Sequence, residues 1–148
     1  MKDIWLWLVI AAAAVLGALL YFTLQTTQGH SRMTMEPPES QSLLISKGME
    51  LAKDLGCFAC HSVDGKTLVG PTWQGLYEHE MEVILPDGTV AKAKADEAYI
   101  KESILEPGAK IVKGFHNTMP SFKNKVSDED IQAIIAYIKT LKREHQHP

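Results

Sequence analysis

The chain has 148 residues, a formal net charge of -3 and two cysteines. This length favours one domain with a modest extension, and the slight negative charge argues against the broad basic face of a nucleic-acid-binding protein. Two cysteines exclude a disulfide framework, so a core or a cofactor has to hold the fold together.

The first segment with a clear pattern is Ile4–Leu24, which is uncharged and almost entirely apolar, with aromatic residues near both ends. At about 1.5 Å per residue, a helix of this length crosses a bilayer core of about 30 Å. We therefore predict a single transmembrane anchor over residues 1–25. The alternative is a cleaved signal peptide with a cleavage site after Ala12–Ala14, but the apolar run continues well beyond those alanines.

The anchor is followed by a polar stretch without apolar periodicity, which predicts a flexible linker over residues 26–42. The domain is then expected over residues 43–148. It should begin with a helix at Leu43–Leu55 that ends at Gly56. Gly48 is unexpected inside this helix, where glycine costs about 1 kcal/mol relative to alanine. Close approach by another helix would explain it.

Two short elements are predicted in the middle of the domain. Glu82–Ala91 has the pattern of a β-hairpin or an ordered loop around the turn Pro86-Asp87-Gly88. Asp96–Leu105 has the pattern of a short helix that stops before Pro107.

The last helix carries the strongest local signals. Ser127 is expected as its N-cap, with Asp130 at the capping-box position. An apolar stripe at helical spacing follows: Ile131, Ile134, Ile135, Ile138 and Leu141. We interpret this stripe as the face that packs on the core.

The chemistry is concentrated in Cys57-Phe58-Ala59-Cys60-His61, a Cys-x-x-Cys-His sequence. This motif predicts one covalently attached haem c, with the Cys57 and Cys60 thiols bound to its vinyl groups and His61 bound to the iron. A zinc half-site is the first alternative, but the chain has no second cysteine pair. A redox-active dithiol is the other, but the βαβ context usual for it is missing.

The second axial position of the haem iron calls for another ligand. Met119 lies far enough beyond His61 for a loop to cross the opposite face of the haem, and Pro120 would stiffen that loop. Met81 is the weaker alternative, and Met49 is too close to the motif. A histidine–methionine pair raises the reduction potential and suits electron transfer.

Several motifs in order resemble a class I cytochrome c domain, and more narrowly the cytochrome c domain fused to subunit II of some bacterial cytochrome c oxidases. They are Gly56-Cys57-x-x-Cys60-His61-Ser62-x-Asp64-Gly65, Gly70-Pro71-Thr72-Trp73-x-Gly75-Leu76-Tyr77, Asp96-Glu97-Ala98-Tyr99-Ile100-x-Glu102-Ser103-Ile104 and Met119-Pro120-x-Phe122. The resemblance implies a mostly α class I cytochrome c fold. Its N- and C-terminal helices cross, with a short middle helix and a small β-hairpin or loop insertion beside them, here with one N-terminal transmembrane helix added.

The resemblance also implies roles for individual residues. The carbonyl of Pro71 should accept a hydrogen bond from His61, and Trp73 should line the haem near a propionate, although core packing alone would also explain Trp73. Gly48 and Tyr137 should mark the crossing of the first and last helices.

The resemblance implies a non-enzymatic electron-transport protein, either a tethered carrier or a non-catalytic subunit of a respiratory complex. The chain departs from a complete oxidase subunit II, which would also carry a copper-binding domain and two membrane spans. Haem attachment outside the cytoplasmic membrane implies a single-pass protein with a periplasmic haem domain. Its expected partners are redox proteins or a respiratory complex, with no nucleic acid and no small-molecule substrate. A peroxidase and a haem-based gas sensor are the alternatives. Four lysines, Lys110, Lys113, Lys123 and Lys125, flank Met119 and predict a local basic rim that steers an acidic partner.

Overall fold

The computed structural model describes residues 16–21 and 38–142. The chain divides into two compact units, residues 1–35 and 36–148. In the first unit, residues 16–21 are helical, and the remainder of the predicted span Ile4–Leu24 lies outside the described residues. Among the helices that are described, none combines the length and the apolar character needed to cross a bilayer.

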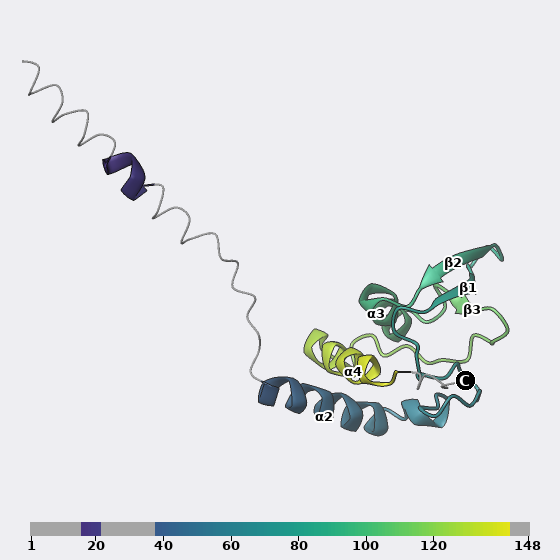
Figure 1. Ribbon diagram of the computed structural model, residues 1–148. Coiled ribbons are helices and arrows are strands. Elements are labelled where there is room, and N and C mark those ends of the chain that lie inside the picture. The colour runs from purple at the N-terminus through teal and green to yellow at the C-terminus, as the bar shows by residue number, and fades with distance from the viewer. Residues whose placement is uncertain (1–15, 22–37, 143–148) are drawn as a thin grey trace, which may run out of the picture. The chain divides into compact units, whose positions relative to one another are not determined.

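The second unit is built on two long helices, α2 (Pro38–Asp54) and α4 (Asp128–Thr140), which lie side by side in Figure 1. Their crossing is close at Gly48, where an added Cβ would lie 1.9 Å from the backbone oxygen of Ala133. The prediction that Gly48 marks a helix crossing is therefore confirmed. The first helix begins earlier than expected, inside the predicted linker 26–42, because proline is well tolerated in the first turn of a helix.

The start of α4 agrees with the prediction from the sequence. The Ser127 side chain accepts a hydrogen bond from the Asp130 amide, and the Asp130 carboxylate accepts one from the Ser127 amide, so the capping box is complete. Lys47 on α2 also contacts Asp130, at 2.8 Å. The Lys47 ammonium is the main cause that lowers the pKa of Asp130 to about 2, and it ties α2 to the start of α4.

The predicted hairpin is present and is longer than expected. Strands β1 (Glu80–Ile84) and β2 (Val90–Lys94) pair antiparallel, with Glu82 opposite Lys92. A third strand that the sequence did not predict, β3 (Ile111–Val112), pairs with the other edge of β1, so the sheet order is β2-β1-β3. Figure 1 shows these strands gathered apart from the α2–α4 pair.

A short helix, α3 (Glu97–Leu105), follows the sheet and is capped by the Asp96 side chain, which accepts a hydrogen bond from the Tyr99 amide. The buried core joins α3 to the stripe on α4 and to the sheet. Its largest fully buried side chains are Ile131, Ile134, Ile135, Ile138 and Val83. The apolar stripe predicted for the last helix is thus the core-facing surface.

Candidate haem site

The Cys-x-x-Cys-His motif begins on a single turn of 3-10 helix, η1 (Cys57–Ala59), two residues after the end of α2, and Cys60 caps this turn. Gly56 connects the two with a φ of 75°, a left-handed conformation that glycine adopts without a steric cost. Both thiols are free and half-buried, and burial raises the pKa of Cys57, so this sulfur is protonated at neutral pH. The turn therefore presents two thiols from one rigid segment.

His61 is oriented by a backbone carbonyl. Its Nδ1 lies 2.8 Å from the oxygen of Pro71, as expected for this pair. Because a carbonyl oxygen can only accept, Nδ1 carries the proton and Nε2 keeps a free lone pair. Burial lowers the pKa of His61 and so favours the neutral ring that can bind a metal ion.

An aromatic cluster packs behind His61. The Trp73 ring stacks on the His61 ring with centroids 5.3 Å apart and an interplanar angle of 25°. Phe58 and Tyr137 meet Trp73 edge-on, at centroid distances of 5.7 Å and 6.4 Å. Trp73 is only 6% exposed, so it belongs to the core as well as to the site.

One cavity connects the motif with the distant methionine. Cys57, Cys60, His61 and Met119 all line it. Its walls are mostly apolar and include Val69, Leu76, Ile100, Ile104, Phe115 and Ile138. Among the methionines of the described residues, Met119 is the one in this lining. Met81 lies on β1 against the core, and Met49 is 48% exposed on α2.

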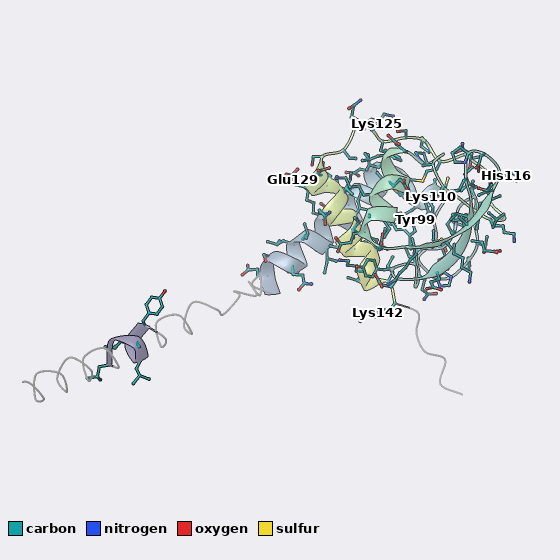
Figure 2. The ribbon with its side chains drawn as sticks, turned by 90° about the horizontal axis from the view of Figure 1, so that it is seen from above. Tyr99, Lys110, His116, Lys125, Glu129 and Lys142 are labelled. Carbon is teal, nitrogen blue, oxygen red and sulfur yellow. The ribbon has the colours of Figure 1, made fainter. Side chains whose placement is uncertain are left out.

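The cavity also has polar side chains that sequence reasoning did not place in the site. Tyr99 and Ser103 reach it from α3, and Lys110 and His116 reach it from the segment before Met119. Tyr99, Lys110 and His116 are labelled in Figure 2. Burial is the main cause that raises the pKa of Tyr99. The sequence did contain one signal for these two residues, because Tyr99 and Ser103 lie one helical turn apart and therefore share a face of the predicted helix.

The residues present fit a covalently attached haem. The donor set consists of two neighbouring thiols, an imidazole nitrogen with a free lone pair and a thioether sulfur, all lining one cavity. Within the described residues no group of three or more histidine, cysteine or carboxylate side chains forms a metal-binding cluster. Haem is a large, mostly apolar group that carries its own metal ion, so it suits both the apolar walls of the cavity and these donor atoms.

The close contact between Gly70 and His61 leads to a prediction. A Cβ at residue 70 would lie 2.6 Å from His61 Cε1 and 2.9 Å from Nδ1. Gly70→Ala should therefore push the ring off the Pro71 carbonyl, reduce the low-spin haem fraction and lower the free energy of unfolding by about 1–3 kcal/mol. Absorption spectra and urea titrations measure both effects.

Gly108→Ala is the matched control, since its Cβ would meet only the flexible Asn117 amide, at 3.1 Å. A Gly70→Ala protein with the wild-type spectrum would show that the tight packing around His61 is unimportant.

The comparisons with known proteins agree with this geometry. The cytochrome c family model matches residues 45–142. The cytochrome c2 iso-2 of Magnetospirillum molischianum is 31% identical over 97 residues, covering 58% of this chain and 91% of that protein.

Two larger relatives are named as oxidase subunits. Cytochrome c oxidase subunit 2 of Alkalihalophilus pseudofirmus is 29% identical over 112 residues, which are 74% of this chain and 29% of that protein. The Cbb3-type cytochrome c oxidase subunit CcoP of Helicobacter pylori is 38% identical over 100 residues, which are 67% of this chain and 28% of that protein. This chain thus spans less than a third of either oxidase subunit.

Proposed function

Since this chain belongs to the cytochrome c family and is therefore an electron-transfer protein with one covalently bound haem c, we propose that it is a membrane-anchored carrier of single electrons in a respiratory chain. The observation that carries the proposal is the meeting of Cys57, Cys60, His61 and Met119 in one largely apolar cavity.

Each of these residues has a distinct part in the proposed mechanism. The Cys57 and Cys60 thiols would hold the haem through its two vinyl groups, and the His61 Nε2 and the Met119 sulfur would bind its iron. The bound haem iron supplies the one-electron chemistry. The Pro71 carbonyl keeps the His61 ring in the tautomer with a free Nε2.

With a haem in place, the mostly apolar walls and Trp73 would leave little room for water in the cavity. Exclusion of water limits the solvent reorganisation that accompanies a change of charge, which favours fast electron transfer. In this proposal Trp73 also lies near a haem propionate.

The proposed location is the cytoplasmic membrane. Residues 1–25 form the single span, with the N-terminus inside and the haem domain on the periplasmic side, where c-type haem is attached. The chain is then a tethered shuttle or a haem subunit of a terminal oxidase or quinol-oxidising complex. The names of the two oxidase relatives support a redox partner of this kind.

The carrier can be distinguished from a peroxidase or a gas sensor by its sixth ligand. A carrier keeps His61 and Met119 on the iron in both oxidation states, whereas the two alternatives need an open or exchangeable position. The reduced protein should therefore show an unchanged absorption spectrum under carbon monoxide. Rapid formation of a carbon monoxide complex in the wild-type protein would exclude the carrier.

The anchor has its own test. If residues 1–25 remain in the mature chain, the protein should sediment with membranes, resist carbonate extraction and dissolve in mild detergent, because about 20 apolar residues stay in the bilayer. Intact mass spectrometry should find the full chain plus one haem. A mature chain that starts after Ala14 or near Gly29 would contradict the anchor.

A further inference from the structure

Three of the four lysines that flank Met119 have acidic partners. The pairs are Lys110–Glu102, Lys113–Glu82 at 2.6 Å and Lys123–Glu106 at 3.0 Å. The predicted basic rim is therefore wrong, because most of its charge is compensated by these carboxylates. Glu102 lies on α3 and Glu106 caps it, so two of the pairs hold the chain around Met119 against this helix.

The carboxyl end of α3 takes hydrogen bonds from the chain after Met119. The last carbonyl groups of a helix have no partner within the helix. The Ile104 oxygen accepts a hydrogen bond from the Phe122 amide at 3.0 Å, and the Leu105 oxygen accepts one from the Ser121 hydroxyl at 2.6 Å. Two residues shortly after Met119 thus complete the end of α3.

The Ser121 hydroxyl makes two hydrogen bonds. It donates to the Leu105 carbonyl and accepts from the Lys123 amide at 3.2 Å, so one side chain bridges the helix and its own loop. Pro120, whose ring fixes φ, is the one residue between Met119 and Ser121. Few backbone rotations therefore separate the methionine from this bridge.

The chain just before Met119 is exposed to solvent. His116, Asn117 and Thr118 are all exposed, and the Thr118 amide donates to the nearby His116 oxygen at 2.9 Å. This hydrogen bond lies within the segment and does not attach it to the domain. Compared with the pairing of β3, which ends at Val112, the attachment through Ser121 is closer to the methionine along the chain.

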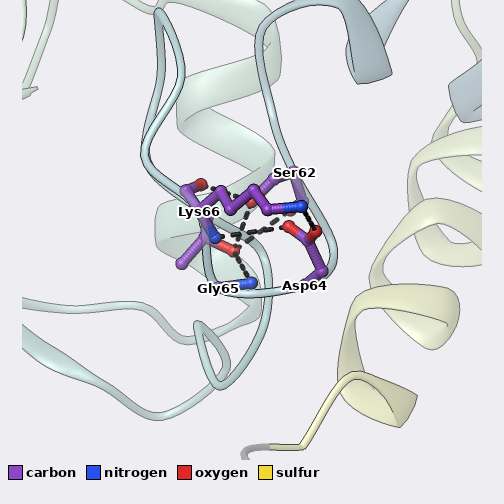
Figure 3. A network of polar contacts seen from close by, with 5 residues as sticks. Ser62, Asp64, Gly65 and Lys66 are labelled. Carbon is purple, nitrogen blue, oxygen red and sulfur yellow. Dashed lines mark hydrogen bonds and ion pairs between the residues drawn. The ribbon is translucent and has the colours of Figure 1, made fainter.

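The loop that carries His61 is held in a different way. Figure 3 shows the polar network inside this loop. The Ser62 hydroxyl lies 2.8 Å from the Thr72 hydroxyl, and the Gly65 amide donates to the same Thr72 oxygen at 3.2 Å. The histidine loop is thus fastened to itself, whereas the methionine segment is fastened to α3.

From these contacts we propose that Ser121 is a positioning residue for Met119, whose hydroxyl fastens the methionine segment to α3 and so limits how often the sulfur leaves the iron. The inference rests on the axial ligation proposed above. Without the hydroxyl, the Leu105 carbonyl and the Lys123 amide lose this partner and turn to water, since the site is exposed. The segment then opens more often, while the sulfur still binds whenever the segment is closed.

The test measures how fast Met119 detaches. The oxidised, haem-loaded full-length protein in mild detergent is mixed with excess imidazole, and the loss of the near-infrared methionine band is followed. At saturating imidazole the rate reaches a plateau that is set by detachment of the methionine. Ser121→Ala should raise this plateau about fivefold, the factor that corresponds to one hydrogen bond of ordinary net strength. Ser121→Thr keeps the hydroxyl and should retain the wild-type plateau.

Ser127→Ala is the matched control. The Ser127 side chain also makes a hydrogen bond to the backbone, to the Asp130 amide at 3.1 Å, so its loss lowers stability, but it lies at the start of α4 and does not line the cavity. It should leave the plateau unchanged. All the variants should keep a reduction potential close to the wild-type value, because Met119 remains the ligand in the closed state.

Hydrogen exchange of the Phe122 amide gives a readout that does not depend on the iron ligand. Exchange should be faster in Ser121→Ala, because the bridge that keeps this amide on the Ile104 oxygen is lost, and unchanged in Ser127→Ala.

Two results would overturn the positioning role. One is a plateau for Ser121→Ala that equals that of the wild type or of Ser127→Ala, and the other is a Ser121→Thr protein that behaves like Ser121→Ala. A wild-type protein without the near-infrared band would instead contradict Met119 as the axial ligand. Exchange of the Phe122 amide would in that case still decide whether Ser121 fastens the segment to α3.

Discussion

Replacing Met119 with alanine should lower the reduction potential by on the order of 0.1 V or more, since axial ligands set haem potentials over a range of roughly 0.8 V. A thioether ligand paired with histidine favours the reduced, ferrous state of the haem iron. Water or a stronger electron donor in the place of the thioether does not favour that state. The near-infrared absorption band of methionine bound to ferric iron should disappear, and carbon monoxide should now bind. Redox titration and optical spectra measure all three effects.

Met81→Ala is the control for this experiment. Met81 is half-buried and packs on the core from β1, so its loss should reduce stability and leave the potential and the near-infrared band unchanged. If Met81→Ala removes the band and Met119→Ala keeps it, the assignment of the sixth ligand is wrong.

Gly48→Ala should lower the free energy of unfolding by about 3 kcal/mol. Alanine favours a helix over glycine by about 1 kcal/mol, but its Cβ would lie 1.9 Å from the Ala133 oxygen and 2.4 Å from its carbonyl carbon. Backbone atoms cannot move aside like a flexible side chain, so α2 and α4 must separate, and overpacking of this kind outweighs the gain in helix propensity.

The loss should be visible in urea unfolding followed by circular dichroism. Ser46→Ala is the control, because Ser46 is exposed on the same helix and its replacement should change stability by less than about 0.5 kcal/mol. Separation of the two helices should also disturb the site, since Tyr137 packs on Trp73 and Ile138 lines the cavity. Gly48→Ala with wild-type stability would mean that the crossing tolerates a Cβ.

The amino-acid sequence by itself determined the features that depend on neighbouring residues. The cofactor was readable because the two thiols and His61 lie within five consecutive positions. The start of α4 was readable because Ser127 and Asp130 cap it across a single turn. The β1–β2 hairpin and the core-facing stripe on α4 followed from spacing in the same way.

Only the tertiary structure decided the features that join distant segments. Met119 lines the cavity and Met81 does not, a difference that sequence spacing alone could not show. Strand β3 has two residues, too few for a pattern, and exists because β1 offers an unpaired edge. Three of the four lysines that flank Met119 have acidic partners, in pairs such as Lys113 with Glu82 on β1, which lie far apart in the sequence. Local spacing in the sequence decides which residues of a single turn lie together. The tertiary fold decides which charges and side chains from distant segments come into contact.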